Sequence, residues 1–263
     1  MSSLLRHTRR PGVVTAGTHI TLDDATLKAR AHACPGVPGM ATVVVLDSLS
    51  VASPAQYHQW GSRLAALGFT HVRTGALPPR HAAQAQLAGL ERVQELALLE
   101  LDRSVARSRR NRRSGPTTVA VRADDLAMMS LIDFAAFGPR WWLDASMLAD
   151  VCHATPRFRA RAIGGDDGAK GEAPIDPRGG FLISGRAGRT GYLQRLAVHP
   201  DRQRGGLATA MLGDSLAWMR RQRVERVFVN THVENEPALS LYRAHGFSEL
   251  RERLAVFEGP IAP

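Results

Sequence analysis

The strongest constraint on the fold of this chain is a stretch in which an apolar strand runs directly into two glycines and then into a helix. Residues 192–198 read YLQRLAV, and after Gly205 and Gly206 the apolar residues Leu207 and Met211 recur at the spacing of a helix. A helix that begins so soon after a strand aims its free backbone N–H groups, and the positive end of its dipole, at one point. The stretch therefore predicts an α/β chain that binds an anion between strand and helix.

The residues around this turn suit a phosphate group. Gly205 and Gly206 let a ligand approach the main chain closely and can adopt the positive φ that a phosphate-binding turn needs. Ala208 and Thr209 keep the first helical turn free of bulky side chains, and Arg202 adds positive charge. We predict a pyrophosphate as the ligand. The alternative is an ordinary strand-to-helix turn with surface arginines, because a glycine pair alone is a weak signal.

Length and composition bound the class of protein. The chain has 263 residues, of which 44% are hydrophobic, which allows one large core or two modest ones. Its formal net charge of +10 favours anionic partners such as phosphorylated cofactors, nucleic acid or acidic proteins. Cys34 and Cys152 are isolated, so we expect neither a metal site nor a disulfide framework. No apolar run approaches the length of a membrane span, and we predict a cytoplasmic protein without a membrane partner.

One arginine-rich stretch divides the sequence. Residues 103–116, RSVARSRRNRRSGP, are short of apolar side chains and end in Ser-Gly-Pro, which predicts a solvated basic linker. The alternative is a nucleic-acid-binding arm, which the absence of interleaved aromatic residues for base stacking disfavours. The linker separates a predicted N-terminal domain, residues 1–102, from a predicted C-terminal domain, residues 117–263.

Hydrophobic periodicity predicts alternating strands and helices on both sides of the linker. In the second half, strands are expected at residues 117–122, 157–163, 181–186, 191–198, 224–231 and 248–258, and helices at residues 123–137, 144–154, 207–219 and 237–247. In the first half, strands are expected at residues 42–48, 69–74 and 92–102, and helices at residues 54–67 and 78–90. Both halves end in a strand, a proline-containing loop, an alanine-rich helix, a Gly–apolar pair and a strand, which predicts a duplicated unit.

A second motif follows the predicted strand at residues 224–231. Asn235 comes just before a short helix that carries Ala238 and Tyr242, and this helix ends at a Gly-Phe pair, residues 246–247. This motif and the glycine turn occur in a fixed order with one strand between them. The pair is therefore a more specific signal than either motif alone.

Together the two motifs resemble the acetyl-CoA-binding core of the GNAT superfamily, the general-control-related N-acetyltransferases. Residues 203–208, Gln-Arg-Gly-Gly-Leu-Ala, satisfy the family's phosphate loop, Gln/Arg-x-x-Gly-x-Gly/Ala, position by position. The resemblance to that core covers residues 192–247. It implies the GNAT acyl-CoA acyltransferase fold, an α/β (α+β) architecture with a mixed, mostly antiparallel sheet flanked by helices, and with a smaller, degenerate N-terminal half.

The resemblance also implies which residues meet the co-substrate, acetyl-CoA, and it implies no metal. Backbone groups of residues 196–198 would line the acyl and pantetheine arm, amides of residues 204–209 would hold the pyrophosphate, and Asn235 would bond to the arm where two parallel strands diverge. The cofactor-binding set is thus Leu196, Ala197, Val198, Gln203, Arg204, Gly205, Gly206, Leu207, Ala208, Thr209, Asn235 and Tyr242.

Acetyl transfer from a thioester to an amine needs a neutral amine, a donor to the oxyanion and a proton for the leaving thiolate. By resemblance, Tyr242 supplies that proton, and the main-chain N–H near Leu196 serves the oxyanion. The family's base positions fall on Tyr192, Gln194 and Asn230, none of which is a base at neutral pH. We therefore predict that Gln194 and Asn230 orient a water that takes the proton, or that the acceptor amine has a low pKa.

The predicted function is direct transfer, in a ternary complex, of an acetyl group from acetyl-CoA to a primary amine of a small molecule or of a protein or peptide N-terminus. The arginine surplus favours an acidic acceptor. The alternative is a catalytically weak acetyl-CoA-binding protein with a regulatory or scaffold role, which the missing base favours and Tyr242 argues against.

The first half departs from the family pattern. It lacks the glycine loop and has Ala85 at the position that matches Tyr242, so we predict that it is non-catalytic. Two further questions stay open from the sequence. Trp141 and Trp142 line an acceptor groove or pack in the core, and the protein is a monomer or a homodimer.

Overall fold

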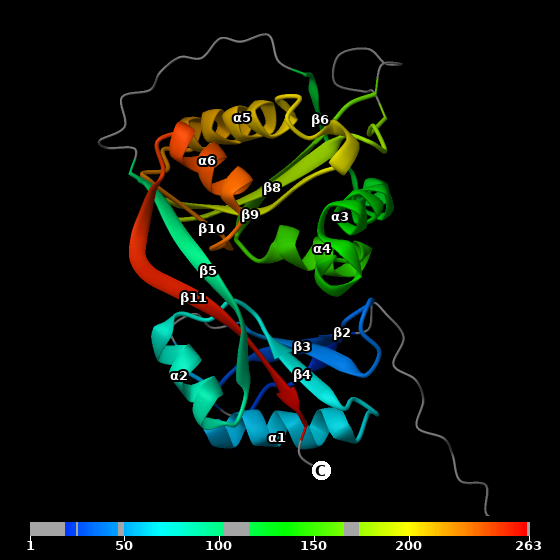
Figure 1. The fold of residues 1–263 in the computed structure, drawn as a ribbon, viewed down its shortest axis with the longest axis vertical. Coiled ribbons are helices and arrows are strands. Elements are labelled where there is room, and N and C mark those ends of the chain that lie inside the picture. Colours follow the sequence, from blue (N-terminus) through cyan, green and yellow to red (C-terminus); the bar gives the residue numbers. More distant parts are fainter. Residues whose placement is uncertain (1–18, 25, 47–49, 103–115, 166–173, 262–263) are drawn as a thin grey trace, which may run out of the picture. The chain divides into compact units, whose positions relative to one another are not determined.

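The computed structural model describes residues 19–24, 26–46, 50–102, 116–165 and 174–261 of the chain. It divides into two compact units (Figure 1). The first unit runs to Gln94 and includes the chain from Ala255 onward, and the second unit is Glu95–Leu254. Apart from Pro116, the predicted basic linker lies outside the described residues.

The second unit is built on a mixed sheet. Its strands are β5 (Glu91–Asp102), β6 (Thr118–Ala120), β7 (Arg157–Ile163), β8 (Gly180–Ala187), β9 (Thr190–Val198) and β10 (Arg226–His232). They lie in the order β5-β10-β9-β8-β7-β6. The β9–β10 pair is parallel, and the other neighbours are antiparallel. The predicted mixed, mostly antiparallel sheet is confirmed.

Helices cover both faces of this sheet (Figure 1). The helices are α3 (Leu126–Trp141), α4 (Ala145–His153), α5 (Leu207–Arg221) and α6 (Glu236–Ala244), with short 3-10 turns at Ala123–Asp125 and Pro200–Arg202. Because side chains alternate along a strand, Phe181 and Ile183 of β8 join the core under α3 and α4, while Leu182 joins the core under α5 and α6. The sheet therefore separates two hydrophobic cores.

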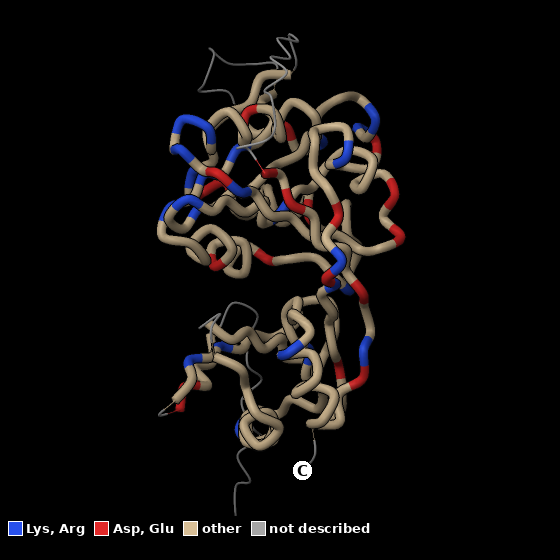
Figure 2. Tube along the Cα trace, turned by 90° about the vertical axis from the view of Figure 1, so that its left-hand side faces the viewer, with Lys and Arg blue, Asp and Glu red and all other residues tan. Residues whose placement is uncertain are grey.

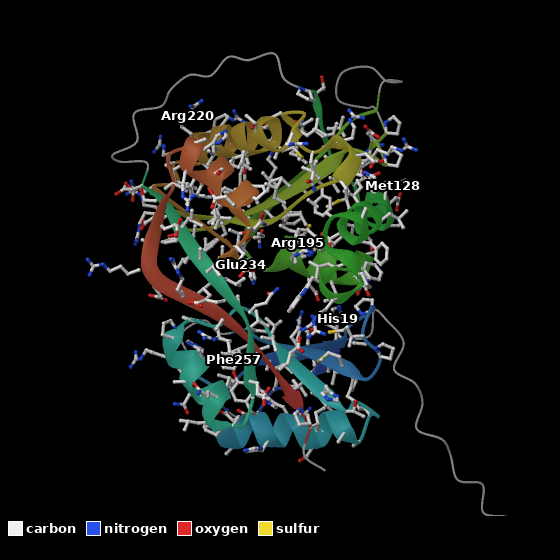
Figure 3. All side chains as sticks on the ribbon, viewed as in Figure 1. His19, Met128, Arg195, Arg220, Glu234 and Phe257 are labelled. Atoms are coloured by element: carbon white, nitrogen blue, oxygen red, sulfur yellow. The ribbon has the colours of Figure 1, made fainter. Side chains whose placement is uncertain are left out.

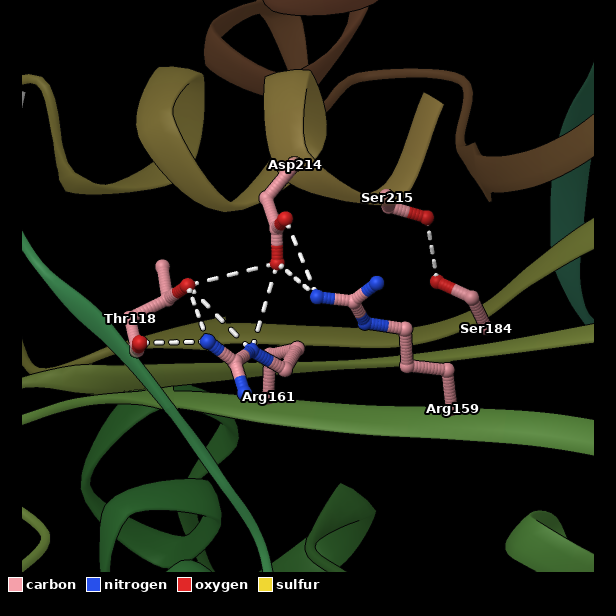
Figure 4. Close-up of polar contacts among 6 residues, drawn as sticks. All are labelled: Thr118, Arg159, Arg161, Ser184, Asp214 and Ser215. Atoms are coloured by element: carbon pink, nitrogen blue, oxygen red, sulfur yellow. Dashed lines mark hydrogen bonds and ion pairs between the residues drawn. The ribbon is translucent and has the colours of Figure 1, made fainter. Parts of the chain in front are cut away.

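A polar network also fastens α5 to the sheet (Figure 4). Asp214 of α5 accepts a hydrogen bond from Arg159 of β7 at 2.9 Å and one from Thr118 of β6 at 3.2 Å, and it pairs with Arg161. Ser215 follows Asp214 on α5, and its hydroxyl lies 2.5 Å from the hydroxyl of Ser184 on β8 in a buried contact. These contacts fix the helix whose first turn carries the predicted phosphate loop.

In the described part of the chain, the first unit has five strands and its own hydrophobic core. Its strands are β1 (Ile20–Thr21), β2 (Ala29–Ala33), β3 (Met40–Val45), β4 (His71–Thr74) and the end of β11 (Ser248–Pro260), in the order β1-β2-β3-β4-β11. Helices α1 (Pro54–Ala65) and α2 (Pro79–Leu87) pack on it through Trp60, Leu64 and Ala85, which are fully or almost fully buried. Every element predicted from periodicity is present, with its ends shifted by a few residues. Strands β1 and β2 were not predicted.

Two long strands cross the boundary between the units. Strand β5 was predicted to end the first domain, but its residues 96–102 pair with β10 of the second unit. Strand β11 leaves the second unit at Leu254, and its residues 258–260 pair with β4. The boundaries of the two units thus lie within these two strands, and the domains at residues 1–102 and 117–263 stay a prediction.

The ends of the two units share a local structure that supports the predicted duplication. Helices α2 and α6 have nine residues each and are followed by Gly89 and Gly246 with φ of 84° and 89°. Buried Leu90 and Phe247 come next and lead into β5 and β11. Within the described part of the chain, no helix has the length and hydropathy needed to cross a membrane.

Candidate functional site

The site is built around two parallel strands that separate. Strands β9 and β10 are paired at Thr190–Arg226, Gly191–Val227 and Tyr192–Phe228. Beyond these pairs, residues 193–198 have no partner on β10 among the residues described, while β10 continues to pair with β5. Backbone N–H and C=O groups on that edge of β9 are therefore free to bond a ligand.

Strand register indicates which of these backbone groups face the gap in pairing. The N–H of His199 donates to the carbonyl of Gly179, on the β8 side, at 2.9 Å. Because successive residues of a strand direct their N–H groups to opposite sides, those of Leu196 and Val198 point away from β8. The oxyanion donor predicted near Leu196 thus lies on the edge that β10 has left.

Strand β9 contains a β-bulge that was not predicted. Ile183 pairs with Arg195 and Ser184 with Leu193, so Gln194 is an extra residue without a partner on β8. The sequence signal was the adjacent polar pair Gln194-Arg195, which breaks the alternation of YLQRLAV. The Gln194 side chain donates to the carbonyl of Val151 in α4 at 2.8 Å. Its predicted role in orienting a water stays a prediction.

The glycine loop connects the 3-10 turn at Pro200–Arg202 to α5. Arg204 and Gly206 both have positive φ, 60° and 81°. These two left-handed residues reverse the chain so that the helix begins at Leu207, directly after the loop. Gly206 is the N-cap and provides no side-chain cap. The first turn is closed by the N–H of Ala210, which donates to the carbonyl of Gly206 at 3.0 Å.

As a result, the backbone amides of the loop and the first helical turn are open. The N–H groups of residues 204–209 have no acceptor among the residues that the structure describes, and residues 203–206 are exposed. Leu207 points the other way, because its side chain is buried in the core under α5. A row of unpaired amides at the positive end of a helix is a binding site for a phosphate group.

Side-chain charge at the loop is partly neutralised. Arg202 forms an ion pair with Asp176 at 3.1 Å, whereas the side chain of Arg204 is exposed. Along the trace of the second unit, basic and acidic residues lie close to one another in many places (Figure 2), and Arg243 pairs with both Glu236 and Glu249. The attraction for an anion at the loop therefore comes mainly from the helix end and from Arg204.

The predicted proton donor is buried beside this site. Tyr242 of α6 is 4% exposed, and its ring contacts that of Phe247 with centroids 5.7 Å apart. Burial raises the pKa of Tyr242, so the phenol stays protonated at neutral pH. Its hydroxyl makes no hydrogen bond with the described part of the protein. The hydroxyl therefore keeps its proton and has no protein acceptor to compete with a ligand.

The side chain of Asn235 stabilises the start of α6. Its Oδ1 accepts from the N–H of Ala238 at 3.3 Å and caps α6, and its Nδ2 donates to the hydroxyl of Thr231 at 3.0 Å. The second hydrogen on Nδ2 is what remains for the predicted bond to the cofactor arm.

The positions of the family's base hold no buried acid or imidazole. Tyr192 and Asn230 are exposed, and Tyr192 stacks on Phe228 with ring centroids 6.3 Å apart. Nearby, Glu236 is bonded by Ser240 and Arg243, and Glu234 is 86% exposed (Figure 3). Trp142 packs edge-to-face on Phe134 with centroids 5.5 Å apart, which favours its packing role.

The first unit has a different structure at the start of α1. Ser53 caps that helix and accepts from the N–H of Gln56, whose side chain in turn accepts from the N–H of Ser53. Pro54 at the first helical position has no N–H. At the start of α1 the N–H groups of Ser53 and Gln56 are thus satisfied, and that of residue 54 is missing.

Comparison with known proteins agrees with this geometry. Residues 169–247 match the model of the acetyltransferase (GNAT) family. A search of the curated proteins gave no match.

Solved structures share the fold over most of the chain. A tandem GNAT protein from the clavulanic acid biosynthesis pathway is similar with a TM-score of 0.59 and 14% identity, over 90% of this chain and 80% of that one. A GCN5-related N-acetyltransferase from Sphaerobacter thermophilus has a TM-score of 0.56 and 14% identity, over 91% and 78%. A putative GNAT-family acetyltransferase from Novosphingobium aromaticivorans has a TM-score of 0.56 and 16% identity, over 92% of each chain.

Proposed function

We propose that the chain is an N-acetyltransferase, since residues 169–247 match the model of the acetyltransferase (GNAT) family. It transfers the acetyl group of acetyl-CoA to a primary amine of a small molecule or of a protein or peptide N-terminus. The transfer is direct and takes place in a ternary complex. The observation that carries this proposal is the row of open amides at residues 204–209, beside the edge of β9 that β10 has left.

In this proposal the backbone binds the co-substrate. The amides of residues 204–209 hold the pyrophosphate, and the free edge of β9 from Leu196 to Val198 bonds the pantetheine arm. The N–H of Leu196 is then directed at the thioester oxygen, where negative charge develops as the amine attacks.

The reaction forms a C–N bond and breaks the C–S bond of the thioester. The attacking amine loses one proton to water, because no buried base occupies Tyr192, Gln194 or Asn230. The CoA thiolate takes a proton from Tyr242, which burial keeps protonated at neutral pH, and water returns a proton to the phenolate that is left. The identity of the acceptor, and its acidity, stay predictions from the charge of the chain.

We also propose that the first half is non-catalytic and binds no CoA. The capping of α1 by Ser53 removes the open amides that a pyrophosphate would need. At the position that corresponds to Tyr242, Ala85 is fully buried and carries no proton donor. Residues 103–116 act as the basic linker between the predicted domains, 1–102 and 117–263.

A second candidate function is an acetyl-CoA-binding regulatory or scaffold protein with weak turnover. The absence of a base at Tyr192, Gln194 and Asn230 favours it. It would leave the binding geometry of the loop unchanged, so binding and turnover must be measured separately.

The test is a calorimetric titration of the full chain with acetyl-CoA, followed by a thiol-release assay over a panel of amines and peptides. Gly206→Asp combined with Ala208→Asp places negative charge at the open amides and should abolish binding. Gly213→Asp is the matched control, because Gly213 is exposed on the same helix and no atom lies within 4 Å of the Cβ it would gain.

Binding that only the paired substitution abolishes, with acceptor-dependent thiol release, is the expected result. Binding without release from any acceptor would favour the regulatory candidate. If acetyl-CoA does not bind, or if the Gly213→Asp control loses binding equally, the proposal is wrong.

A further inference from the structure

The bulge in β9 places two consecutive polar side chains on one face of the sheet. Leu193 packs in the core under α5, and Ala197 packs in the core under α3 and α4. Between them, the Gln194 side chain bonds to α4 and the Arg195 side chain bonds to α3, so both lie on the face of the sheet that α3 and α4 cover. A strand without a bulge would direct adjacent side chains to opposite faces.

Arg195 makes a paired, buried contact with α3 (Figure 3). Its Nε and one terminal nitrogen donate to the two carboxylate oxygens of Asp133 at 2.8 and 2.6 Å. The side chain of Asp133 is 0% exposed, and the Arg195 guanidinium lies 3.7 Å from the centroid of the Phe137 ring. Two parallel charge-assisted bonds and a stacked ring fix the direction of this side chain.

The same pair holds the corner between α3 and α4. The Arg195 guanidinium also donates to the carbonyl of Trp141 at 2.9 Å, and the N–H of Leu143 donates to Asp133 at 2.7 Å. Helix α3 is interrupted just before this corner, where Gly138 has φ of 70° and is followed by a proline. One ion pair therefore connects a strand, a helix and the turn after it.

Gln194 makes the second connection, to α4, through its bond to the Val151 carbonyl. Space for it exists because residue 185 of β8 is glycine. A Cβ on Gly185 would lie 2.6 Å from the Gln194 side-chain oxygen and 2.2 Å from the hydroxyl of Thr155. The bulge is thus held from two helices at adjacent residues.

We propose that the Asp133–Arg195 pair and the Gln194–Val151 bond form a clamp that sets the direction of the Leu196 N–H. Leu196 is the first residue after the clamped pair, so a rotation of the bulge would turn its N–H away from the thioester oxygen. Asp133, Arg195 and Gln194 are therefore positioning residues. The inference rests on the proposed function, since it concerns the same site.

The clamp acts on the chemical step and not on cofactor affinity. The amides proposed to hold the pyrophosphate belong to the loop before α5 and to the first turn of that helix, which covers the opposite face of the sheet from α3 and α4. Loss of the clamp should lower kcat about tenfold to a hundredfold, the cost of misplacing a reacting group by about 1 Å, while the Kd for acetyl-CoA stays within about twofold.

The test compares Asp133→Asn, Arg195→Lys and Gln194→Met in the full chain. Arg195→Lys keeps the charge but loses the two-pronged geometry, and Gln194→Met is mild enough to fold if the ion-pair variants do not. Arg159→Met is the matched control, because it breaks the Arg159–Asp214 pair, which is also partly buried but joins β7 to α5 and not to the helices of the clamp. For each variant, kcat, the KM for the acceptor and the Kd for acetyl-CoA are measured.

The expected result is a lower kcat in all three clamp variants with unchanged acetyl-CoA affinity, and no such split in Arg159→Met. The inference is overturned if folded clamp variants keep the wild-type kcat, or if kcat falls only together with acetyl-CoA affinity.

A separate readout covers the case in which the wild-type chain shows no turnover. Amide exchange of residues 193–198 should be faster in the clamp variants than in Arg159→Met. Faster exchange supports the clamp even if the proposed function fails, and unchanged exchange overturns the clamp.

Discussion

At the scale of single residues, the phosphate loop depends on backbone angles that only glycine adopts at low cost. Gly206 meets this requirement, but Arg204 has φ of 60° and carries a side chain. A non-glycine residue in this region pays a steric penalty of about 1 kcal/mol or more. Arg204 is exposed beside the open amides, which is consistent with a role for its charge in attracting a phosphate group.

Substitutions at Arg204 should separate strain from charge. Arg204→Gly and Arg204→Ala both remove the charge, so both should weaken acetyl-CoA binding. Only Arg204→Gly relieves the backbone, and it should be more stable than Arg204→Ala by about 1 kcal/mol in chemical unfolding. Arg202 is the control, because it lies in a 3-10 turn. In that conformation Arg202→Ala should be more stable than Arg202→Gly. The same order of stability at both positions would contradict this account.

The burial of Tyr242 leads to a prediction about the pH dependence of kcat. Burial raises its pKa above the ordinary value of 10.0, so the donating, protonated form persists to higher pH than it would in an exposed tyrosine. We expect Tyr242→Phe to lower kcat about a hundredfold, and we expect wild-type kcat to show no decline below pH 10 that the variant lacks. A decline in kcat near pH 8 in the wild type alone would show that Tyr242 ionises early and would contradict the burial argument.

At the scale of elements, the sequence allowed most helices and strands to be predicted, because apolar residues recur at helical or alternating spacing. The open start of α5 was also predicted, from Gly205-Gly206, whereas the cap of α1 by Ser53 was not. Strands β1 and β2 were missed, since ARAHA in β2 consists of alanines and polar residues and not of β-branched ones. The Asp133–Arg195 pair joins residues that are far apart in the sequence, so no local pattern indicates it.

The attachment of α5 to the sheet gives a prediction at this scale. Asp214→Asn would remove the charge that Arg159 and Arg161 share (Figure 4), leaving two partly buried cations without their acid. We expect a loss of about 1.5–3 kcal/mol in the free energy of unfolding, as for hydrogen bonds to charged groups. Asp201→Asn is the control, because Asp201 has a side chain that is 65% exposed. Equal losses in both variants would rule out a special role for Asp214.

At the scale of the whole molecule, two units of related local structure differ at the starts of α1 and α5. Both have a helix of nine residues, a glycine of positive φ and a long strand at their ends, and those strands cross between the units. The partners of β5 and β11 could not be predicted from composition, because pairing depends on which edges are left open by the rest of the fold. The open amides lie in the second unit, and the account assigns acyl-CoA binding to that unit.

Amide exchange with and without acetyl-CoA measures whether the open amides of the second unit bind the co-substrate. The account predicts slower exchange at residues 204–209 and at Leu196 and Val198 when acetyl-CoA is added to the full chain. We expect no change at residues 55–57, where α1 begins with its own cap. Equal protection of both helix starts, or no protection at residues 204–209 under conditions in which acetyl-CoA binds, would contradict it.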